Sequence, residues 1–257
     1  MDIIAGIHPV REALRAGRRL DHLAIARGAG GPRIQELVDL CRREGTPVRF
    51  EPREALDRAA AKANHQGVVA FAAAHAYADL ASIGPDAKLL VVLDGVEDPH
   101  NLGAIARTAH AAGASALVIP ERRAAGVNET VSKAAAGALE YLPIVRTANI
   151  SRALDDLKRR GFWVYGFDER GGQLYHETEY ATPSVFVLGG EGHGLHQNVR
   201  AHCDVVVRIP MAGPIASLNV SVAAGVVLFE WRRRQAMPKN DRTSGSSEGT
   251  HSNPLPE

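Results

Sequence analysis

From Lys88 onwards, short apolar runs alternate with segments of helical pattern, and this alternation restricts the possible folds more than any other feature of the sequence. The segment 88–96, KLLVVLDGV, holds a continuous apolar run, which is typical of a strand buried on both faces of a parallel sheet. A helical segment that ends at Gly113 follows, and the same order repeats up to residue 234. The pattern predicts an α/β domain over residues 88–234, with helices on both faces of a parallel sheet.

The elements of this domain follow from the periods and from the residues at their ends. Asn101 and Ser217 are suited to cap the helices that they open, and Gly161 is suited to end one. Apolar residues extend around much of the circumference of the last helix, which indicates burial beyond one sheet face. The predicted strands are 88–96, 115–120, 142–147, 162–167, 184–190 and 204–210, and the predicted helices are 101–113, 128–139, 150–161, 196–203 and 218–234.

The first 75 residues have the pattern of a separate, smaller α/β unit. Pro9 and Pro32 stand where helices begin, and the segment 32–45 carries apolar side chains on one face at helical spacing. We expect residues 76–87 to form a linker, and residues 235–257, which are polar and rich in Ser, Gly and Pro, to form a disordered tail. The predicted strands of this unit are 20–27, 46–50 and 67–74.

Composition excludes several classes of protein. The 30 Lys and Arg residues balance 29 Asp and Glu residues, so the chain is not a polybasic segment, although residues 1–75 hold 12 basic and only 9 acidic residues. Cys41 and Cys203 form no CxxC pair, which argues against a disulfide scaffold or a zinc site and fits a reducing, cytoplasmic setting. We expect no metal, no signal peptide and no membrane span. The first candidates for phosphate contacts are Arg11, Arg15, Arg18 and Arg19.

Three loops at predicted strand ends carry the candidates for chemistry, because ligands of open parallel sheets bind at the carboxyl ends of strands. The loop 98–107 runs into a helix and includes Asn101 and Arg107. The loop 188–194 is rich in glycine, which lets backbone approach a ligand closely, and it contains Glu191. The loop 209–221 passes through Gly and Pro into the first turn of the last helix, where free N–H groups are expected.

Two other interpretations of these loops stay open on the residues alone. A Rossmann-type methyltransferase or dehydrogenase would carry its glycine loop after the first strand, with an acid about 20 residues further on. Here the glycine loop comes late, and Leu195 stands where a G-x-G-x-x-G loop has its last glycine. A protein that binds RNA without catalysis is the other alternative, against which Arg107, Glu191 and Asn219 argue.

In this order, N-x-G-x-x-x-R, L-G-x-E-G-x-G and I-P-M-x-G-x-x-x-S-L-N-V-S resemble the three motifs of the SpoU/TrmH branch of the SPOUT RNA 2′-O-methyltransferases. The resemblance covers residues 88–234. The segments from Gly6 to Leu14 and from His65 to Ala70 look like the ribosomal-protein-like substrate domain of one subgroup. That subgroup contains the bacterial enzyme that methylates a guanosine ribose in the peptidyl-transferase region of large-subunit rRNA.

The resemblance implies a fold, a cofactor and a reaction. The sheet would be threaded through a loop to form a deep trefoil knot over residues 184–234, although folded chains are almost never knotted. S-adenosyl-L-methionine would bind in the knot and donate its methyl group to a ribose 2′-hydroxyl. The resemblance assigns cofactor binding to Leu188, Gly189, Gly190, Ile209, Met211 and Leu218, and catalysis to Arg107, Asn101, Glu191, Ser217 and Asn219.

The resemblance also implies partners. Members of the family act as homodimers with the knot region at the interface, and site residues approach from both chains. The expected substrate is RNA, in the first place 23S rRNA or a ribosome assembly intermediate in the cytoplasm. A tRNA target within the same family, or RNA binding without catalysis, is the alternative.

Arg107 admits two roles under this resemblance. As a general base it would have to lose its proton, which costs roughly 7 kcal/mol at pH 7 for a pKa of about 12.5. As a cation that grips a phosphate and stabilises negative charge on the 2′-oxygen it stays protonated, and this is the role that we favour. Both roles predict that substitution of Arg107 abolishes methyl transfer.

Overall fold

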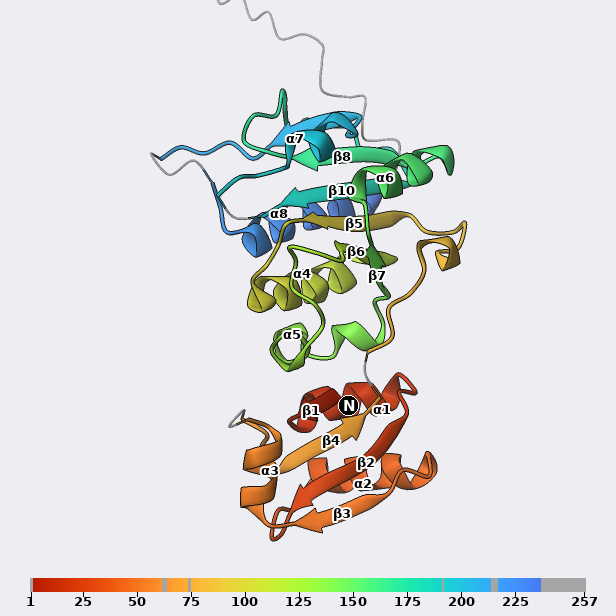
Figure 1. Cartoon of the computed structure of the whole chain (residues 1–257), viewed down its shortest axis with the longest axis vertical. Coiled ribbons are helices and arrows are strands. Elements are labelled where there is room, and N and C mark those ends of the chain that lie inside the picture. The colour runs from red at the N-terminus through yellow and green to blue at the C-terminus, as the bar shows by residue number, and fades with distance from the viewer. Residues whose placement is uncertain (1, 62–63, 74, 191, 214–216, 237–257) are drawn as a thin grey trace, which may run out of the picture.

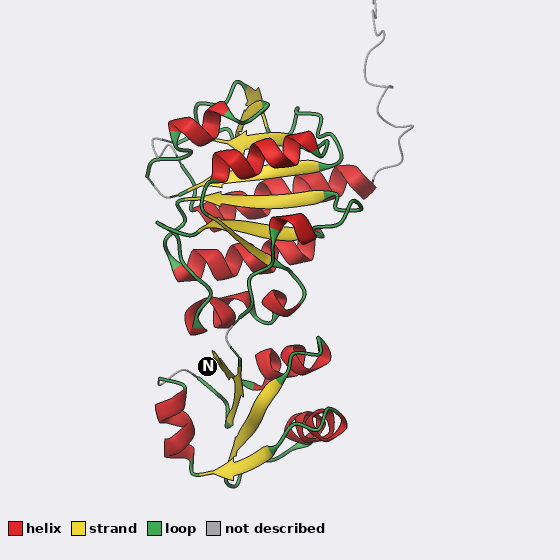
Figure 2. Cartoon of the chain, turned by 45° about the vertical axis from the view of Figure 1, so that its right-hand side comes forward, coloured by secondary structure: helices red, strands yellow, loops and turns green. Residues whose placement is uncertain are grey.

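The computed structural model describes residues 2–61, 64–73, 75–190, 192–213 and 217–236, which form two units arranged end to end (Figure 1). The smaller unit contains the N-terminus, and the sheet of the larger unit begins at residue 89. Each unit packs helices against both faces of one sheet (Figure 2). The predicted α/β class of both units is confirmed.

The N-terminal unit is built on a four-stranded sheet with the strand order β1-β4-β2-β3. Strand β4 (Val68–Ala72) lies antiparallel between β1 (Asp2–Ala5) and β2 (Leu20–Ala26), and β3 (Val48–Glu51) runs parallel to β2. Strand β1 was not predicted, because four residues are too few to show a period and only pairing with β4 makes them a strand. Helices α1 (Ile7–Arg15) and α2 (Pro32–Arg43) cover one face, and α3 (Arg53–Ala59) packs on the other.

The larger unit has a seven-stranded sheet in the order β7-β6-β5-β10-β8-β11-β9, and its strand pairs are parallel. Its strands are β5 (Leu89–Asp94), β6 (Ala116–Pro120), β7 (Ile144–Thr147), β8 (Trp163–Phe167), β9 (Gln173–Leu174), β10 (Ser184–Gly189) and β11 (Val205–Arg208). Its α-helices are α4 (Pro99–Ala112), α5 (Glu129–Ala135), α6 (Ile150–Arg159), α7 (Gln197–Ala201) and α8 (Val220–Ala236), and 3-10 turns lie at Leu80–Ser82 and Ala138–Glu140.

The apolar run of β5 is buried on both faces, as its sequence predicts. Leu89, Val91 and Leu93 pack into the core under α4, α5 and α8. Leu90 and Val92 pack into the core under α6 and α7 on the opposite face. The strand is therefore a central element of a three-layer α/β/α unit.

Strand β10 returns to the middle of the sheet and pairs with β5 on one side and β8 on the other. Strand β10 is thereby inserted between two strands that precede it in sequence. This insertion brings the glycine loop after β10 next to the loop after β5. The trefoil knot over residues 184–234 remains a prediction.

The predicted caps of two helices are wrong by a few residues. Helix α4 begins at Pro99, and its cap is Asp98, whose carboxylate accepts a hydrogen bond from the His100 N–H at 2.9 Å. Helix α8 begins at Val220, and the carbonyl oxygen of the Asn219 side chain accepts from the Ser221 N–H at 2.9 Å. Asn101 and Ser217 therefore do not cap these helices. Asn219 caps α8 and does not lie inside its first turn.

Two further elements differ from the predictions. The helix expected over 128–139 ends at Ala135, because Ala136 adopts a left-handed conformation with φ of +49° and a separate 3-10 turn follows. The two-residue strand β9 was not predicted, since its pairing with β11 alone defines it.

Residues 76–87 lie along the edge of the larger sheet. Ala78 bridges to Val145 of β7, and Ile83 and Ala87 are buried in the core on the α6 side. Helix α8 continues to Ala236, past the predicted start of the tail at residue 235. Residues 237–257, to which the expected disorder mainly refers, lie outside the described residues. Within the described residues, no helix is long and apolar enough to cross a membrane.

Candidate active site

The carboxyl ends of the two central strands lie side by side. Strands β5 and β10 pair in register as far as Asp94 and Gly189. One residue later the Gly190 N–H donates to the carbonyl oxygen of Asp94 at 2.8 Å. The loop after β5 and the glycine loop after β10 therefore leave the sheet together.

Glycines 189, 190 and 194 are required by the packing of these loops against each other. A Cβ on Gly189 would lie 2.2 Å from the backbone of Gly194, and a Cβ on Gly190 would lie 2.1 Å from the carbonyl oxygen of Gly95. Gly194 has a positive φ of +62°, and a Cβ there would meet the Asp168 carboxylate at 2.7 Å. The sequence suggested that these glycines let a ligand approach the backbone. The structure shows instead that they let the neighbouring loops contact each other.

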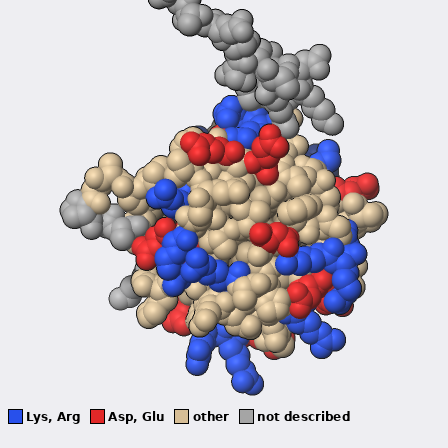
Figure 3. All heavy atoms as spheres, turned by 90° about the horizontal axis from the view of Figure 1, so that it is seen from above, with Lys and Arg blue, Asp and Glu red and all other residues tan. Residues whose placement is uncertain are grey.

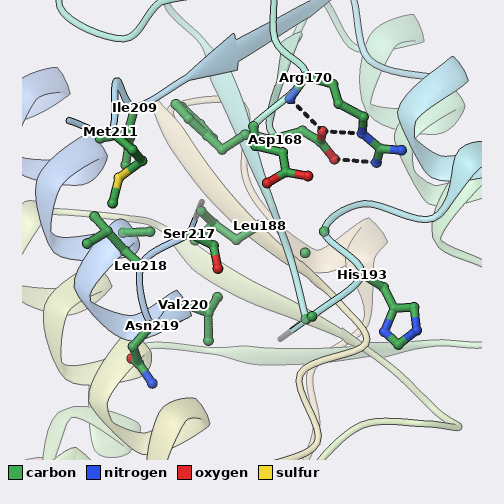
Figure 4. A pocket seen from close by; sticks show the side chains of 17 residues that line it. Asp168, Arg170, Leu188, His193, Ile209, Met211, Ser217, Leu218, Asn219 and Val220 are labelled. Atoms are coloured by element: carbon green, nitrogen blue, oxygen red, sulfur yellow. Dashed lines mark hydrogen bonds and ion pairs between the residues drawn. The ribbon is translucent and has the colours of Figure 1, made fainter. Parts of the chain in front are cut away.

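A cavity of about 320 Å³ opens beside the glycine loop, and this volume is typical of small-molecule sites. Ile209, Met211 and Leu218 gather on one side of it, and Asp168 and Arg170 lie on the other (Figure 4). The lining comes from the ends of three strands and the start of α8, and consists of Phe167, Asp168, Glu169, Arg170, Leu188, Gly189, Gly190, Gly192, His193, Gly194, Ile209, Met211, Ser217, Leu218, Asn219, Val220 and Ala223.

Asp168, directly after β8, carries a fixed negative charge in the wall of this cavity. Its carboxylate accepts from Arg170 Nε at 2.7 Å and Nη2 at 2.8 Å, and from the Leu195 N–H at 3.1 Å. These donors, above all the Arg170 guanidinium, hold the pKa of the Asp168 carboxyl at about 2. The carboxylate ties the loop after β8 to the glycine loop and shapes one side of the cavity.

A hydrogen bond between two asparagines joins the first predicted loop to the third. Nδ2 of Asn219 donates to Oδ1 of Asn101 at 3.1 Å, across 118 residues of sequence. Asn101 is buried in the first turn of α4, and Asn219 caps α8. The bond therefore fixes the starts of both helices relative to each other at the edge of the cavity.

A second cavity, of about 560 Å³, adjoins the first and shares Gly190, His193 and Gly194 with it. In its wall the carboxylate of Asp94 accepts the His196 N–H at 2.8 Å and contacts His196 Nδ1 at 3.0 Å. Its lining consists of Asp94, Gly95, Val96, Glu97, Asp98, Asn101, Arg123, Gly190, His193, Gly194 and His196.

Charge on the end of the molecule remote from the N-terminal unit is mixed. Basic and acidic side chains are interspersed around a broad uncharged area (Figure 3). Among the described residues that this view shows, charges of both signs alternate, so they form no surface of a single sign that would mark a path for RNA.

The structure brings most of the predicted site residues together. The first cavity is lined by Leu188, Gly189, Gly190, Ile209, Met211, Ser217, Leu218 and Asn219, and the second by Asn101. Arg107 is exposed on α4 and lines neither cavity. Glu191 lies outside the described residues. The roles assigned to all these residues remain predictions.

Sequence reasoning missed the loop after β8. Phe167, Asp168, Glu169 and Arg170 line the first cavity, and His193 lines both. The signal was available, because this segment directly follows a predicted strand of a parallel sheet, where ligands bind. The described residues hold no group of three or more His, Cys, Asp or Glu side chains placed to bind a metal ion.

Two models of known families match separate parts of the chain. The model of the SpoU rRNA Methylase family matches residues 88–229, and the model for RNA 2′-O ribose methyltransferase substrate binding matches residues 3–78. The 23S rRNA (guanosine-2′-O-)-methyltransferase RlmB of Xanthomonas campestris is 41% identical over 239 residues, which are 90% of this chain and 96% of that protein.

Solved structures of similar proteins cover both units. The SpoU methyltransferase AviRb from Streptomyces viridochromogenes, in complex with AdoMet, has a TM-score of 0.78 and 27% identity and covers 91% of this chain and 90% of that one. An AdoMet-bound rRNA methyltransferase from Sinorhizobium meliloti has a TM-score of 0.76 and 27% identity and covers 92% of this chain and 88% of that one. The resemblance inferred from the motifs is thus confirmed, and the chain belongs to the SpoU rRNA methylase family.

Proposed function

We propose that this chain transfers a methyl group from S-adenosyl-L-methionine to a ribose 2′-hydroxyl of RNA, and that the target is a guanosine of 23S rRNA. The observation that carries the proposal is the cavity beside the glycine loop, whose walls include residues of the second and third family motifs. Similarity to RlmB over nearly the whole chain favours rRNA over tRNA as the substrate.

The first cavity suits the cofactor. Met211 and Leu218 are exposed and Ile209 is half-buried, so an adenine placed against them would cover apolar surface that now faces water. Glu169 and Arg170 line the same cavity and offer charges of both signs to an amino-acid group. Bound here, S-adenosyl-L-methionine supplies an electrophilic methyl group on a sulfonium.

The second cavity suits the acceptor nucleotide. Methyl transfer requires the 2′-oxygen to lie in line with the methyl group, so the acceptor must bind in space continuous with the cofactor site. The second cavity shares three residues with the first and is lined by Asn101, whose side chain is held by Asn219. We assign this asparagine pair to the orientation of the ribose, together with Ser217 and Glu191.

Arg107 and the exposed face of α8 support a homodimer. Val222, Val226 and Phe229 follow one another at helical spacing, and the exposed fractions of Val222 and Phe229 are 51% and 49%. Such an apolar stripe on a surface helix is typical of a protein interface. We propose that two copies meet along α8 and that Arg107, which lines neither of the two cavities described above, completes a site formed by both copies and stabilises negative charge there.

The place of action follows from the substrate. An enzyme that modifies 23S rRNA meets its target on naked rRNA or on an assembling ribosomal particle, so we propose the cytoplasm as its location. The acceptor hydroxyl must reach the second cavity, which favours an assembly intermediate in which the target nucleotide is still accessible.

The test is methyl transfer from tritiated S-adenosyl-L-methionine to 23S rRNA and, in parallel, to bulk tRNA. Label in 23S rRNA that maps to the 2′-oxygen of a guanosine is the expected result. Label found only in tRNA would show that the substrate is tRNA and not 23S rRNA. Binding of 23S rRNA without any transfer would support the non-catalytic alternative and overturn the proposed activity.

A further inference from the structure

Three of the four arginines that the sequence offered for RNA contacts form ion pairs within the protein. Arg15 pairs with Glu36 at 2.7 Å, and Arg11 contacts Glu12 at 3.3 Å. Arg18 is held by Asp2 and Glu140 and is mostly buried. These pairs reduce the charge that Arg11, Arg15 and Arg18 offer to RNA, whereas Arg19 is exposed.

One face of the N-terminal sheet is only partly covered. Helix α3 packs on this face over Ala26 and Val69 and spans seven residues, whereas the opposite face carries both α1 and α2. The part of the face beyond α3 holds Phe71 of β4 and His22 of β2, which stand directly opposite each other in the strand pairing. Both side chains are half-buried.

The rings of His22 and Phe71 form a close parallel stack. Their centroids are 4.3 Å apart and their planes differ by 9°. Ile3 of β1 stands opposite Phe71 on its other side, so an apolar row crosses three strands and ends at His22. Strand β3 begins at Val48, opposite Leu23, and so no residue of β3 stands opposite His22.

A basic side chain, that of Arg49, lies beside this row and could contact a phosphate of a nucleic acid. Arg49 of β3 pairs with Ala24, which places it on the same sheet face as His22, and its side chain is exposed. Partial burial, the largest cause, and the nearby Arg49 lower the pKa of His22 and favour its uncharged ring, while the carboxylates of Glu51 and Asp21 act in the opposite direction. A neutral two-ring stack with a cation beside it offers a base a stacking surface and its phosphate a partner.

We propose that the His22–Phe71 stack is a platform on which an unpaired base of the substrate RNA stacks, with Arg49 contacting the adjoining phosphate. The proposal rests on the proposed RNA methyltransferase function and assigns its substrate-binding unit a specific surface. Single-stranded bases are recognised by stacking on aromatic side chains of open sheets, since every base presents a π-face.

The experiment compares variants of the full chain in two measurements with 23S rRNA, the Michaelis constant for this RNA in the tritium assay and its direct binding. His22→Ala is expected to weaken RNA binding about tenfold, within the range measured for loss of one stacked base. His22→Phe is expected to restore affinity, because it keeps the ring. The kcat and the affinity for S-adenosyl-L-methionine should stay at wild-type values in both variants.

Phe50 provides the matched control. It pairs with Ile25 on the opposite face of the same sheet and is 57% exposed, so Phe50→Ser removes an exposed ring without touching the platform. The salt dependence of RNA affinity distinguishes the phosphate contact of Arg49 from base stacking on His22. Arg49→Ala should reduce the slope of log affinity against log salt by about 0.7–0.9, whereas His22→Ala should leave the slope unchanged.

Ultraviolet crosslinking of the wild-type chain to 23S rRNA should label the peptides that contain His22 or Phe71. Wild-type RNA affinity in folded His22→Ala, or an equal loss in Phe50→Ser, would overturn the platform. Failure of the proposed function itself would look different, because the wild-type chain would then transfer no methyl group to RNA.

Discussion

The guanidinium of Arg18 in the N-terminal unit donates to the carboxylate of Glu140 in the larger unit at 2.8 Å, although 122 residues separate them in sequence. The same guanidinium donates to Asp2 at 2.7 Å and to the carbonyl oxygen of Ala73 at 3.1 Å. The side chains of Arg18 and Glu140 are only 14% and 11% exposed. Arg18 therefore docks the two units, whereas its expected contact with RNA stays a prediction.

A second contact lies beside this ion pair. The Tyr141 hydroxyl donates to the Glu12 carboxylate at 3.2 Å. Gly137 makes the approach possible, because a Cβ there would lie 2.6 Å from the Cβ of Glu12 and its φ is +93°. The N-terminal unit is thus held against the larger one by specific contacts as well as by the connecting segment.

Substitution Arg18→Ala should loosen this docking. It leaves Asp2 and Glu140 without their shared cation, which is expected to cost about 2–3 kcal/mol of unfolding free energy. Calorimetry should show the two units melting separately, and the KM for RNA should rise while the affinity for S-adenosyl-L-methionine stays constant. Arg42→Ala, which breaks an exposed pair with Asp39, is the control and should change little. A single unchanged transition in Arg18→Ala would contradict the docking role.

Substitution Asn219→Asp should separate two functions of Asn219. An aspartate can still cap α8 by accepting the Ser221 N–H, but it cannot donate to Asn101. We expect nearly unchanged stability and a roughly 10- to 100-fold lower kcat, a loss of about 1.4–2.8 kcal/mol in transition-state stabilisation. Asn219→Ala should lose about 1 kcal/mol of stability as well.

The coupling between the two asparagines can be measured directly. Combining Asn101→Ala with Asn219→Ala should lower kcat by much less than the product of the single effects, because each substitution already removes their shared bond. Fully additive losses would show that the two asparagines act independently.

Substitution Arg107→Ala should abolish methyl transfer and leave the affinity for S-adenosyl-L-methionine within a few-fold, because Arg107 does not line the cofactor cavity. Arg107→Lys should fail too, since a point charge does not replace a planar fork of donors. Isothermal titration and the tritium assay separate the two effects. Arg152→Ala, an exposed arginine on α6, is the matched control. Full turnover by Arg107→Lys would refute this role.

Substitution Phe229→Glu should place a charge in the proposed α8 interface and produce monomers. Light scattering should report half the wild-type mass, and activity should fall while circular dichroism shows that the variant is still folded. Trp163→Gln removes a side chain of similar exposure, 51%, from a site away from α8 and should not change the mass. A wild-type chain that is already monomeric would rule out the interface.

Acid should weaken the site through Asp168. Its pKa in the fold, about 2, lies below the ordinary value of 3.8, so the ionised carboxylate stabilises the fold at neutral pH. That contribution, roughly 2 kcal/mol at most, is present above about pH 5 and is lost as the pH falls towards 2. Thermal melting of Asp168→Asn should show a smaller loss of stability between these pH values than the wild type. Asp156→Asn, at an exposed ion pair, should follow the wild type.

Local patterns in the sequence were sufficient for most elements of the larger unit. The apolar run at 88–96 predicted a central strand because burial on both faces removes any reason for alternation, and β5 has its two sets of side chains in separate cores. Elements defined only by pairing, such as β1 and β9, could not be predicted, because two to four residues show no period.

Some features of the candidate site could likewise be predicted from the sequence, and others could not. Local sequence was enough to predict the family motifs, the glycine loop and the apolar side chains of Ile209, Met211 and Leu218. The arrangement in space was needed to show that Asp168 and Arg170 line the same cavity, that Asn101 binds Asn219, and that Arg18 belongs to a contact between units. These contacts join residues far apart in the chain through the order of strands in the sheet, and insertion of β10 between β5 and β8 leaves no periodic trace in the sequence.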